Sequence, residues 1–351
     1  MSLLSIPATI ELPAEGWLRA GGDASRNGTR RVWRDGAIVD GLERDAGLAE
    51  SFARCKAITR LHARNFYLGL SLAPEPRRSA LLAIYTWMRH ADDLADDPGR
   101  GVEERVAALR ALRAMTAEAV APNRDATAAS NDADCAGECA PEWWAAFAAS
   151  ARAYRIPPTV FMDTLDALEA DARGVVVGDA QDLARYCDRV AGTVAVACVC
   201  IWGLRDRTDE AAAWRLAILR ARAVQLTNIL RDVREDLACE PRRVYVPADS
   251  LARHGVKAEG LAAWTPADGC GGVFAEWTGE ARRLYEASGG LEDAVDPACA
   301  RVCWALAAVY RALLERIAAE PSRAARERVR VARARKLRIA LAGWLGVGLP
   351  G

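Results

Sequence analysis

The sequence predicts an all-α fold, and three observations support this. From Ser51 onward, apolar residues recur at intervals of three and four, which is the spacing of one helix face. Alternation of the kind found in strands is short where it occurs, as at Val244–Val246. No segment repeats with a period of roughly 20–50 residues. We therefore expect a single helical domain over residues 49–345.

The composition is that of an ordinary globular protein. The 351 residues are 52% hydrophobic and 27% charged, with a formal net charge of zero. A chain without excess positive charge is not directed toward nucleic acid, so an anionic ligand must be bound by a local cluster. The N-terminal stretch Met1–Glu15 has neither the basic nor the apolar region of a secretory signal, and we expect a cytoplasmic protein.

The helical pattern runs along the chain with two exceptions. Residues 1–48 are rich in Gly, Arg and Asp without helical periodicity, so we expect a poorly structured extension. The stretch 122–141 is small and polar and predicts a loop insertion. The expected helical segments are Leu81–Asp97, Ala151–Gly174, Asp182–Leu204, Glu210–Ala238, Val273–Ser288 and Pro297–Ile317.

The longest uncharged run is Val190–Leu204, between Arg189 and Arg205. It is too short to cross a bilayer and predicts a buried core helix. Its small residues would also leave room beside them for neighbouring helices or for an elongated apolar ligand.

A cluster of acids ends the first strongly helical segment. Asp92 and Asp96 are four residues apart, so their carboxylates project from one helix face, and Asp93 and Asp97 repeat this spacing beside them. Like charges at a helix C-terminus repel one another and oppose the helix dipole, and a cation would relieve both costs. Mg²⁺ suits such carboxylates and shares its other positions with water and phosphate. Alone, the cluster is equally typical of a solvated helix end.

A second polar stripe lies in the segment that begins at Gln225. Asn228, Asp232 and Asp236 follow at successive intervals of four, with Arg231 beside them. Two such stripes on separate helices would hold Mg²⁺ and a diphosphate between them, and arginine would donate to phosphate oxygens. A lone DxxxD is weak evidence, whereas two of them form a stronger signal.

With these stripes the sequence resembles the squalene/phytoene synthase family over roughly residues 52 to 342. The matching stretches are His62–Phe66, Tyr85–Asp97, Tyr186–Val194, Gln225–Asp236, Arg242–Pro247 and Arg328–Leu341. The resemblance implies the isoprenoid synthase fold, a helical bundle around a central apolar cavity. It also departs from the family: Ala63 and Asn65 stand where many relatives have serines, and Asp188 and Arg189 where many phytoene synthases have an aromatic and a small residue.

The resemblance also implies roles for individual residues. Two or three Mg²⁺ ions would be held by Asp92, Asp96, Asn228, Asp232 and Asp236. The catalytic residues would be the four aspartates of this set together with Tyr186. The substrate-binding residues would be His62, Arg64, Phe66, Tyr85, Arg89, Gln225, Arg231, Tyr245 and Tyr310.

The implied reaction is the head-to-head (1′-1) condensation of two prenyl diphosphates through a cyclopropylcarbinyl diphosphate. Farnesyl diphosphate would give presqualene diphosphate or squalene, and geranylgeranyl diphosphate would give phytoene. NADPH would enter only if the product is squalene, and the sequence has no strand–GxGxxG–helix unit for a dinucleotide. Leu70, one turn beyond Phe66, would shorten the substrate pocket and favours the farnesyl substrate.

Two other functions stay open from the sequence. A head-to-tail prenyl synthase or terpene cyclase shares aspartate-rich helices but usually carries DDxxD and a different second motif. A non-catalytic helical binding or assembly protein would be free to lose metal ligands, and here every acid of both stripes is present. Finally, the basic run Arg323–Arg338, followed by apolar Ile339–Leu349, is typical of a solvated helix face or of peripheral contact with an anionic membrane.

Overall fold

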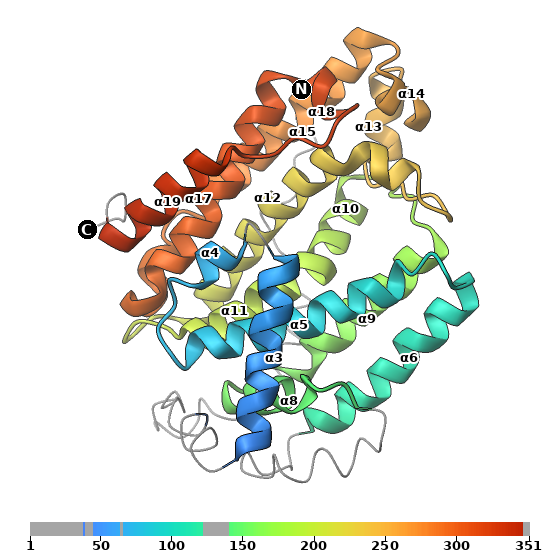
Figure 1. Ribbon diagram of the computed structural model, residues 1–351. Coiled ribbons are helices and arrows are strands. Elements are labelled where there is room, and N and C mark those ends of the chain that lie inside the picture. The colour runs from blue at the N-terminus through green and yellow to red at the C-terminus, as the bar shows by residue number, and fades with distance from the viewer. Residues whose placement is uncertain (1–37, 39–44, 64–65, 122–139, 347–351) are drawn as a thin grey trace.

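The computed structural model describes residues 38, 45–63, 66–121 and 140–346, and these residues form a bundle of helices (Figure 1). Within these ranges no β-strand forms, and extended pairing is limited to two isolated bridges, Val176 with Val244 and Leu204 with Val295. The all-α prediction is confirmed. The helices are α3 (Ala46–His62), α4 (Phe66–Leu70), α5 (Arg77–Ala95), α6 (Val102–Ala119), α8 (Trp144–Ala153), α9 (Pro158–Arg173), α10 (Ala180–Cys187), the π-helical turn η2 (Asp188–Gly192), α11 (Thr193–Trp202), α12 (Glu210–Leu237), α13 (Ala248–Arg253), α14 (Ala258–Ala263), α15 (Ala267–Ala287), α16 (Leu291–Ala294), α17 (Pro297–Ala319), α18 (Pro321–Ala324) and α19 (Arg333–Leu345).

Helix boundaries follow local signals that the periodicity alone does not contain. The prediction of one helix over Ala151–Gly174 is wrong, because α8 ends at Ala153 and α9 begins at Pro158. Proline fixes φ and lacks an N–H group, so it belongs at a helix start rather than inside one. Helix α3 begins before Ser51, since the Asp45 side chain accepts hydrogen bonds from the backbone at its N-terminus. The predicted loop and N-terminal extension lie almost entirely outside the described residues.

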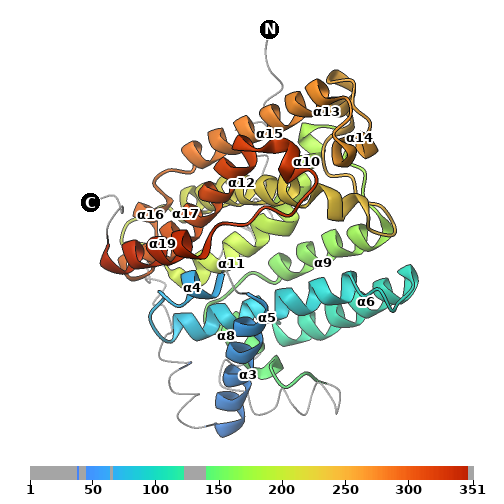
Figure 2. The ribbon, with the colours of Figure 1, turned by 45° about the horizontal axis from the view of Figure 1, so that its top comes forward.

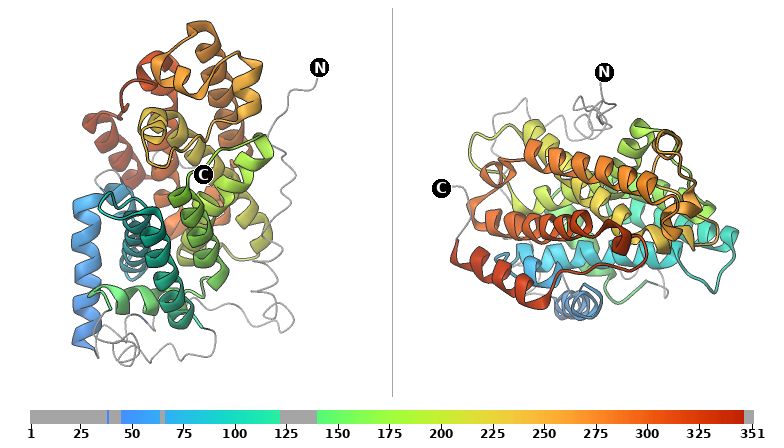
Figure 3. Two further views of the ribbon diagram at one scale, coloured as in Figure 1. Left: turned by 90° about the vertical axis from the view of Figure 1, so that its right-hand side faces the viewer. Right: turned by 90° about the horizontal axis from the view of Figure 1, so that it is seen from above.

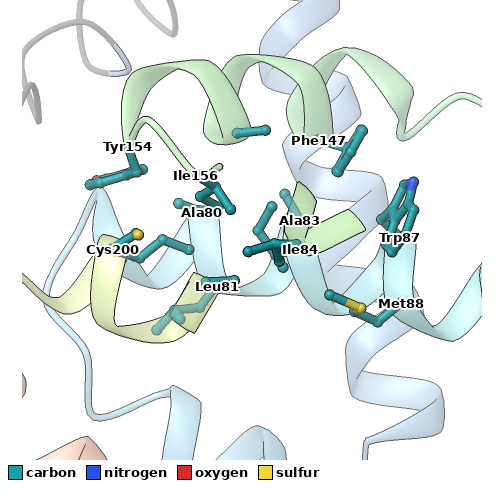
Figure 4. Packing of buried hydrophobic residues seen from close by; sticks show 14 of the residues in the cluster. Ala80, Leu81, Ala83, Ile84, Trp87, Met88, Phe147, Tyr154, Ile156 and Cys200 are labelled. Atoms are coloured by element: carbon teal, nitrogen blue, oxygen red, sulfur yellow. The ribbon is translucent and has the colours of Figure 1, made fainter. Parts of the chain in front are cut away.

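The first of two apolar clusters packs α5 against α3, α8 and α9. At its centre the Trp87 ring stacks on Phe147 with centroids 5.5 Å apart (Figure 4). Trp87 also meets Phe161 edge-on, with centroids 5.0 Å apart. All three side chains are almost completely buried. This packing fixes the face of α5 that carries the first acid stripe.

The second cluster packs α12 against α15, α17 and α10. Helix α12 also contacts α11 and η2, so it runs through the middle of the bundle (Figure 2). The second stripe is therefore carried by a helix that neighbouring elements support along its length.

The long uncharged run is a buried helix, as predicted, with one interruption. Residues 188–192 form the π-helical turn η2, and α11 then ends at Trp202. Among the helices of the described residues, none combines the length and the hydropathy needed to cross a bilayer.

Candidate active site

The acids of α5 stand where the helix leaves the core. Ala91 and Ala95 are buried and turn one face of the last helical turn inward, which leaves Asp92 and Asp96 exposed to solvent. Asp96 is the C-cap residue, and its backbone is no longer α-helical, with φ at −105°. One turn earlier, Arg89 forms an ion pair with Asp93. The two predicted carboxylates therefore lie side by side at the end of the helix.

The polar stripe of α12 is half-buried along its whole length. Asn228, Asp232 and Asp236 share one side of the helix, and each remains partly accessible. The apolar residues of the same segment are buried in the second cluster: Leu226, Ile229, Leu230 and Val233. The spacing of the sequence is thus preserved as a polar face on a buried helix.

Guanidinium groups already pair with the middle of this stripe. Arg231 donates to both carboxylate oxygens of Asp232, from Nε to Oδ1 at 2.7 Å and from Nη2 to Oδ2. Arg328 Nε, from the extended segment after α18, lies 3.2 Å from the same oxygen. Tyr310 on α17 hydrogen-bonds with Arg231 and Asn228. The part of the site around Asp232 therefore carries both carboxylate and guanidinium groups, which suit a cation and an anion respectively.

Asp171 on α9 joins the two stripes, although it belongs to neither. Its carboxylate accepts hydrogen bonds from Tyr186 Oη at 3.1 Å and from Tyr245 Oη at 2.9 Å. The two tyrosine rings are stacked with centroids 4.6 Å apart. Arg243 donates to the Asp171 backbone carbonyl at 3.1 Å and to Asp96 Oδ1 at 2.7 Å. The Arg243 backbone N–H also donates to the Asp236 carbonyl of α12 at 3.2 Å. Asp171 and Arg243 together thus connect α5, α9, α10 and α12.

The pKa values of three aspartates in the site are raised because these acids are buried close together. Burial and the neighbouring Asp96 raise the pKa of Asp92 to about 7. Part of the Asp92 side chain is open to solvent, but many protein atoms lie around its carboxyl group and desolvate it. Burial likewise raises the pKa of Asp171 to about 6, although Arg243 and the two tyrosines lower it. Burial and the neighbouring Asp232 raise the pKa of Asp236 to about 8. A bound cation would favour the charged form of all three.

The donor set fits Mg²⁺ shared with a diphosphate. Among the described residues, no three His, Cys, Asp or Glu side chains come close enough to hold an ion by themselves. Mg²⁺ seldom needs this, because it keeps water and substrate phosphate as ligands. Asn228 Oδ1 is buried and has no hydrogen-bond partner, while its Nδ2 donates to Gln225 Oε1 at 3.2 Å. An unsatisfied buried carbonyl oxygen beside two carboxylates is a suitable ligand for a hard cation.

Four more residues were predicted to bind substrate, and the structure describes only some of them fully. Tyr85 lies on α5 one turn before Arg89 and is half-buried, and burial raises its pKa. His62 ends α3 and is exposed. Arg64 lies outside the described residues, as does the side chain of Phe66, whose backbone begins α4.

Sequence reasoning missed Asp171, because it stands in no acidic spacing pattern and meets its tyrosines only in the folded chain. It had no role for Arg243 or Arg328 either, although both lie in stretches that carried the resemblance.

A shallow pocket opens beside the Asp236 end of α12. Its lining combines the site with the second apolar cluster and consists of Ile229, Val233, Asp236, Leu237, Arg243, Val244, Tyr245, Val246 and Leu261. Polar and apolar groups thus lie side by side in this pocket. A central cavity that encloses whole prenyl chains stays a prediction.

The chain is similar to known proteins over most of its length. The family model described as squalene/phytoene synthase matches residues 59–335. The phytoene synthase of Thermus thermophilus is 34% identical over 261 residues, which cover 74% of this chain and 81% of that protein. The presqualene diphosphate synthase of Zymomonas mobilis is 34% identical over 202 residues, covering 57% and 62%.

Solved structures share the fold. A squalene synthase from Alicyclobacillus acidocaldarius superposes with a TM-score of 0.66 at 24% identity, covering 83% of this chain and 99% of that one. A dehydrosqualene synthase in complex with ligand gives a TM-score of 0.69 at 24% identity, covering 87% and 98%. The family model spans most of the chain, and both acid stripes lie inside it. The chain therefore belongs to the squalene/phytoene synthase family and is a prenyltransferase.

Proposed function

We propose that this prenyltransferase carries out the head-to-head (1′-1) condensation of two prenyl diphosphates through a cyclopropylcarbinyl diphosphate intermediate. The observation that carries the proposal is the Asp171 connection, which joins the first acid stripe to a stacked tyrosine pair. Arg243, which donates to Asp96, also donates its backbone N–H to Asp236 O at 3.2 Å, and so links this arrangement to the Asn228–Asp236 stripe. The names of the phytoene and presqualene diphosphate synthases that it resembles support the same reaction type.

Each part of the site has a task in this reaction. Asp92 and Asp96 on one side, and Asn228, Asp232 and Asp236 on the other, would hold two or three Mg²⁺ ions. When bound, these ions neutralise charge on the departing diphosphate. The Arg231 and Arg328 guanidinium groups, now paired with Asp232, would donate to the same phosphate oxygens.

The tyrosine pair would face the reacting carbons. Burial and the adjacent Asp171 raise the pKa of Tyr186 well above its usual value, and burial does the same for Tyr245. Both therefore stay neutral phenols at physiological pH. Their π faces would stabilise an allylic cation, and the buried surroundings would keep it from water.

For the substrate we propose farnesyl diphosphate, because Leu70 is large and buried in α4, where it packs in the first apolar cluster. The product is then presqualene diphosphate, or squalene if NADPH is used. The test is product analysis after incubating the full chain with Mg²⁺ and either farnesyl or geranylgeranyl diphosphate. A head-to-tail product, or no product from either substrate, contradicts the reaction. Preference for the longer substrate contradicts only the substrate assignment.

Peripheral contact with a membrane is part of this proposal. The tails of the substrates are apolar and the product is more so, hence both partition into lipid. The basic C-terminal segment supports contact with an anionic surface.

A further inference from the structure

Helix α19 exposes a continuous apolar stripe. Of the six large apolar side chains that the described residues leave more than half exposed, four belong to this one helix: Leu337 (58%), Leu341 (56%), Trp344 (64%) and Leu345 (59%). Their spacing of four, three and one places them on one face over two turns. Single exposed apolar residues are normal, whereas a gathered stripe calls for a partner.

The opposite face of α19 fixes this orientation. It packs on α17, and Ile339 reaches the second apolar cluster. Gly343 is buried, and a Cβ built on it would lie 3.3 Å from Leu72 and 3.5 Å from Trp304. The helix therefore sits against the bundle along one side, at the edge of the molecule (Figure 3), and cannot easily rotate to hide its apolar stripe.

The charge of the chain segment that carries the stripe has a single sign. Glu327 is the last acid of the sequence, and no carboxylate side chain follows it up to Gly351. Burial and the nearby Arg330 and Arg333 lower the pKa of Lys336, which reflects how closely the cations are packed. The basic residues that follow Glu327 are Arg328, which pairs with Asp232, and Arg330, Arg333, Arg335, Lys336 and Arg338.

We propose that the stripe Leu337–Leu341–Trp344–Leu345 is the docking face of the protein on a bilayer that carries anionic lipid. The proposal rests on the peripheral membrane contact proposed above and names its surface. An amphipathic helix with Leu and Trp on one side and arginines beside them inserts its apolar face at the headgroup boundary. A second copy of the chain is the poorer partner, because it would bring the same cluster of cations against this one.

The test is flotation of the full chain with vesicles of phosphatidylcholine alone or mixed with phosphatidylglycerol. We expect binding to the mixed vesicles that weakens as salt is added. The triple variant Leu337→Ser/Leu341→Ser/Trp344→Ser should lose roughly tenfold or more of this affinity. The matched control is Val176→Ser, which removes an apolar side chain that is 73% exposed elsewhere and should bind like the wild type.

A second pair of variants tests the charge. Arg333→Gln/Arg338→Gln should lose the preference for anionic lipid, whereas Arg207→Gln/Arg215→Gln, exposed but distant in sequence, should keep it. Quenching of tryptophan fluorescence by brominated lipid chains should fall in Trp344→Phe.

Three results would overturn the proposal: equal binding to neutral vesicles, wild-type binding by the triple variant, or a wild-type dimer that the triple variant dissolves while vesicle binding stays unchanged. Turnover of the wild type in detergent is measured separately, so failure of the reaction and failure of docking are distinguishable.

Discussion

The Asp171 carboxylate uses both of its oxygens, one for each stacked tyrosine. In Asp171→Asn only one oxygen remains to accept, so one phenol loses its partner and the pair loosens. A hydrogen bond to a charged group contributes about 1.5–3 kcal/mol. We therefore expect kcat to fall roughly tenfold to a hundredfold with little change in KM. The control is Asp166→Asn, an exposed acid earlier on α9. Unchanged kcat in Asp171→Asn would show that the tyrosines hold their places without it.

The acid stripes allow a stricter comparison. Asp92→Ala or Asp232→Ala removes a metal ligand, and each should abolish Mg²⁺-dependent turnover while leaving helix content by circular dichroism unchanged. Asp97→Ala and Glu235→Ala change neighbouring acids outside the two ligand sets and should retain most activity. Near-normal turnover by a well-folded Asp232→Ala protein would rule out the shared metal site.

At this scale the sequence predicts whatever depends on local spacing. Asp92 and Asp96, or Asn228 and Asp232, are related by one helical turn, so their shared face follows from the helix itself. Asp171 has its partners only in the folded chain, where α9 brings it to tyrosines 15 and 74 positions away. No local pattern carries that information.

Among the elements, η2 is held to α12 by a buried ion pair. Arg222 binds both oxygens of Asp188, Nε at 2.6 Å and Nη2 at 2.7 Å, and both side chains are almost inaccessible. Asp188 stood out in the sequence as a departure from the aromatic residue common in phytoene synthases, and the structure supplies its partner 34 positions away. Sequence order gave no reason to connect the two.

Breaking this pair should cost more than removing it. Asp188→Ala leaves a buried guanidinium without a counter-ion, and we expect a loss of about 3–5 kcal/mol in the free energy of unfolding. The double variant Asp188→Leu/Arg222→Met removes both charges and should recover most of that loss. Urea denaturation measures both. If the double variant is as unstable as the sum of its single changes, the two residues do not act as a pair.

For the molecule as a whole, acid stability should depend on paired glutamates inside the bundle. Burial alone would raise the pKa of Glu292, but the two-nitrogen ion pair with Arg220 outweighs it and lowers this pKa below the ordinary value of 4.5. A lowered folded-state pKa contributes stability that is fully present above about pH 4.5 and is lost as pH falls through the folded value.

Glu292→Gln should therefore have a lower melting temperature at neutral pH and a shallower decline below about pH 5. Thermal melts between about pH 3 and pH 7 test this, with the exposed Glu286→Gln as control. A variant whose curve runs parallel to that of the wild type at every pH would contradict the role of ionisation.

The acids that converge around Asp171 have a consequence for the folding landscape. Most of the bundle is minimally frustrated, since buried faces and caps favour the same structure, but here carboxyl groups are buried so close together that the pKa values of Asp92 and Asp236 rise. A ligand that removes this frustration binds only the folded state and so shifts the folding equilibrium, by about 2.7 kcal/mol at roughly 100 times its Kd. We expect Mg²⁺ and inorganic pyrophosphate together to raise the melting temperature by more than the sum of their separate effects, and Asp232→Ala to lose that excess. Thermal shift measurements on the free chain would then detect the substrate site before any product is assayed, because part of the free energy of unfolding would be gained only when the ligands bind.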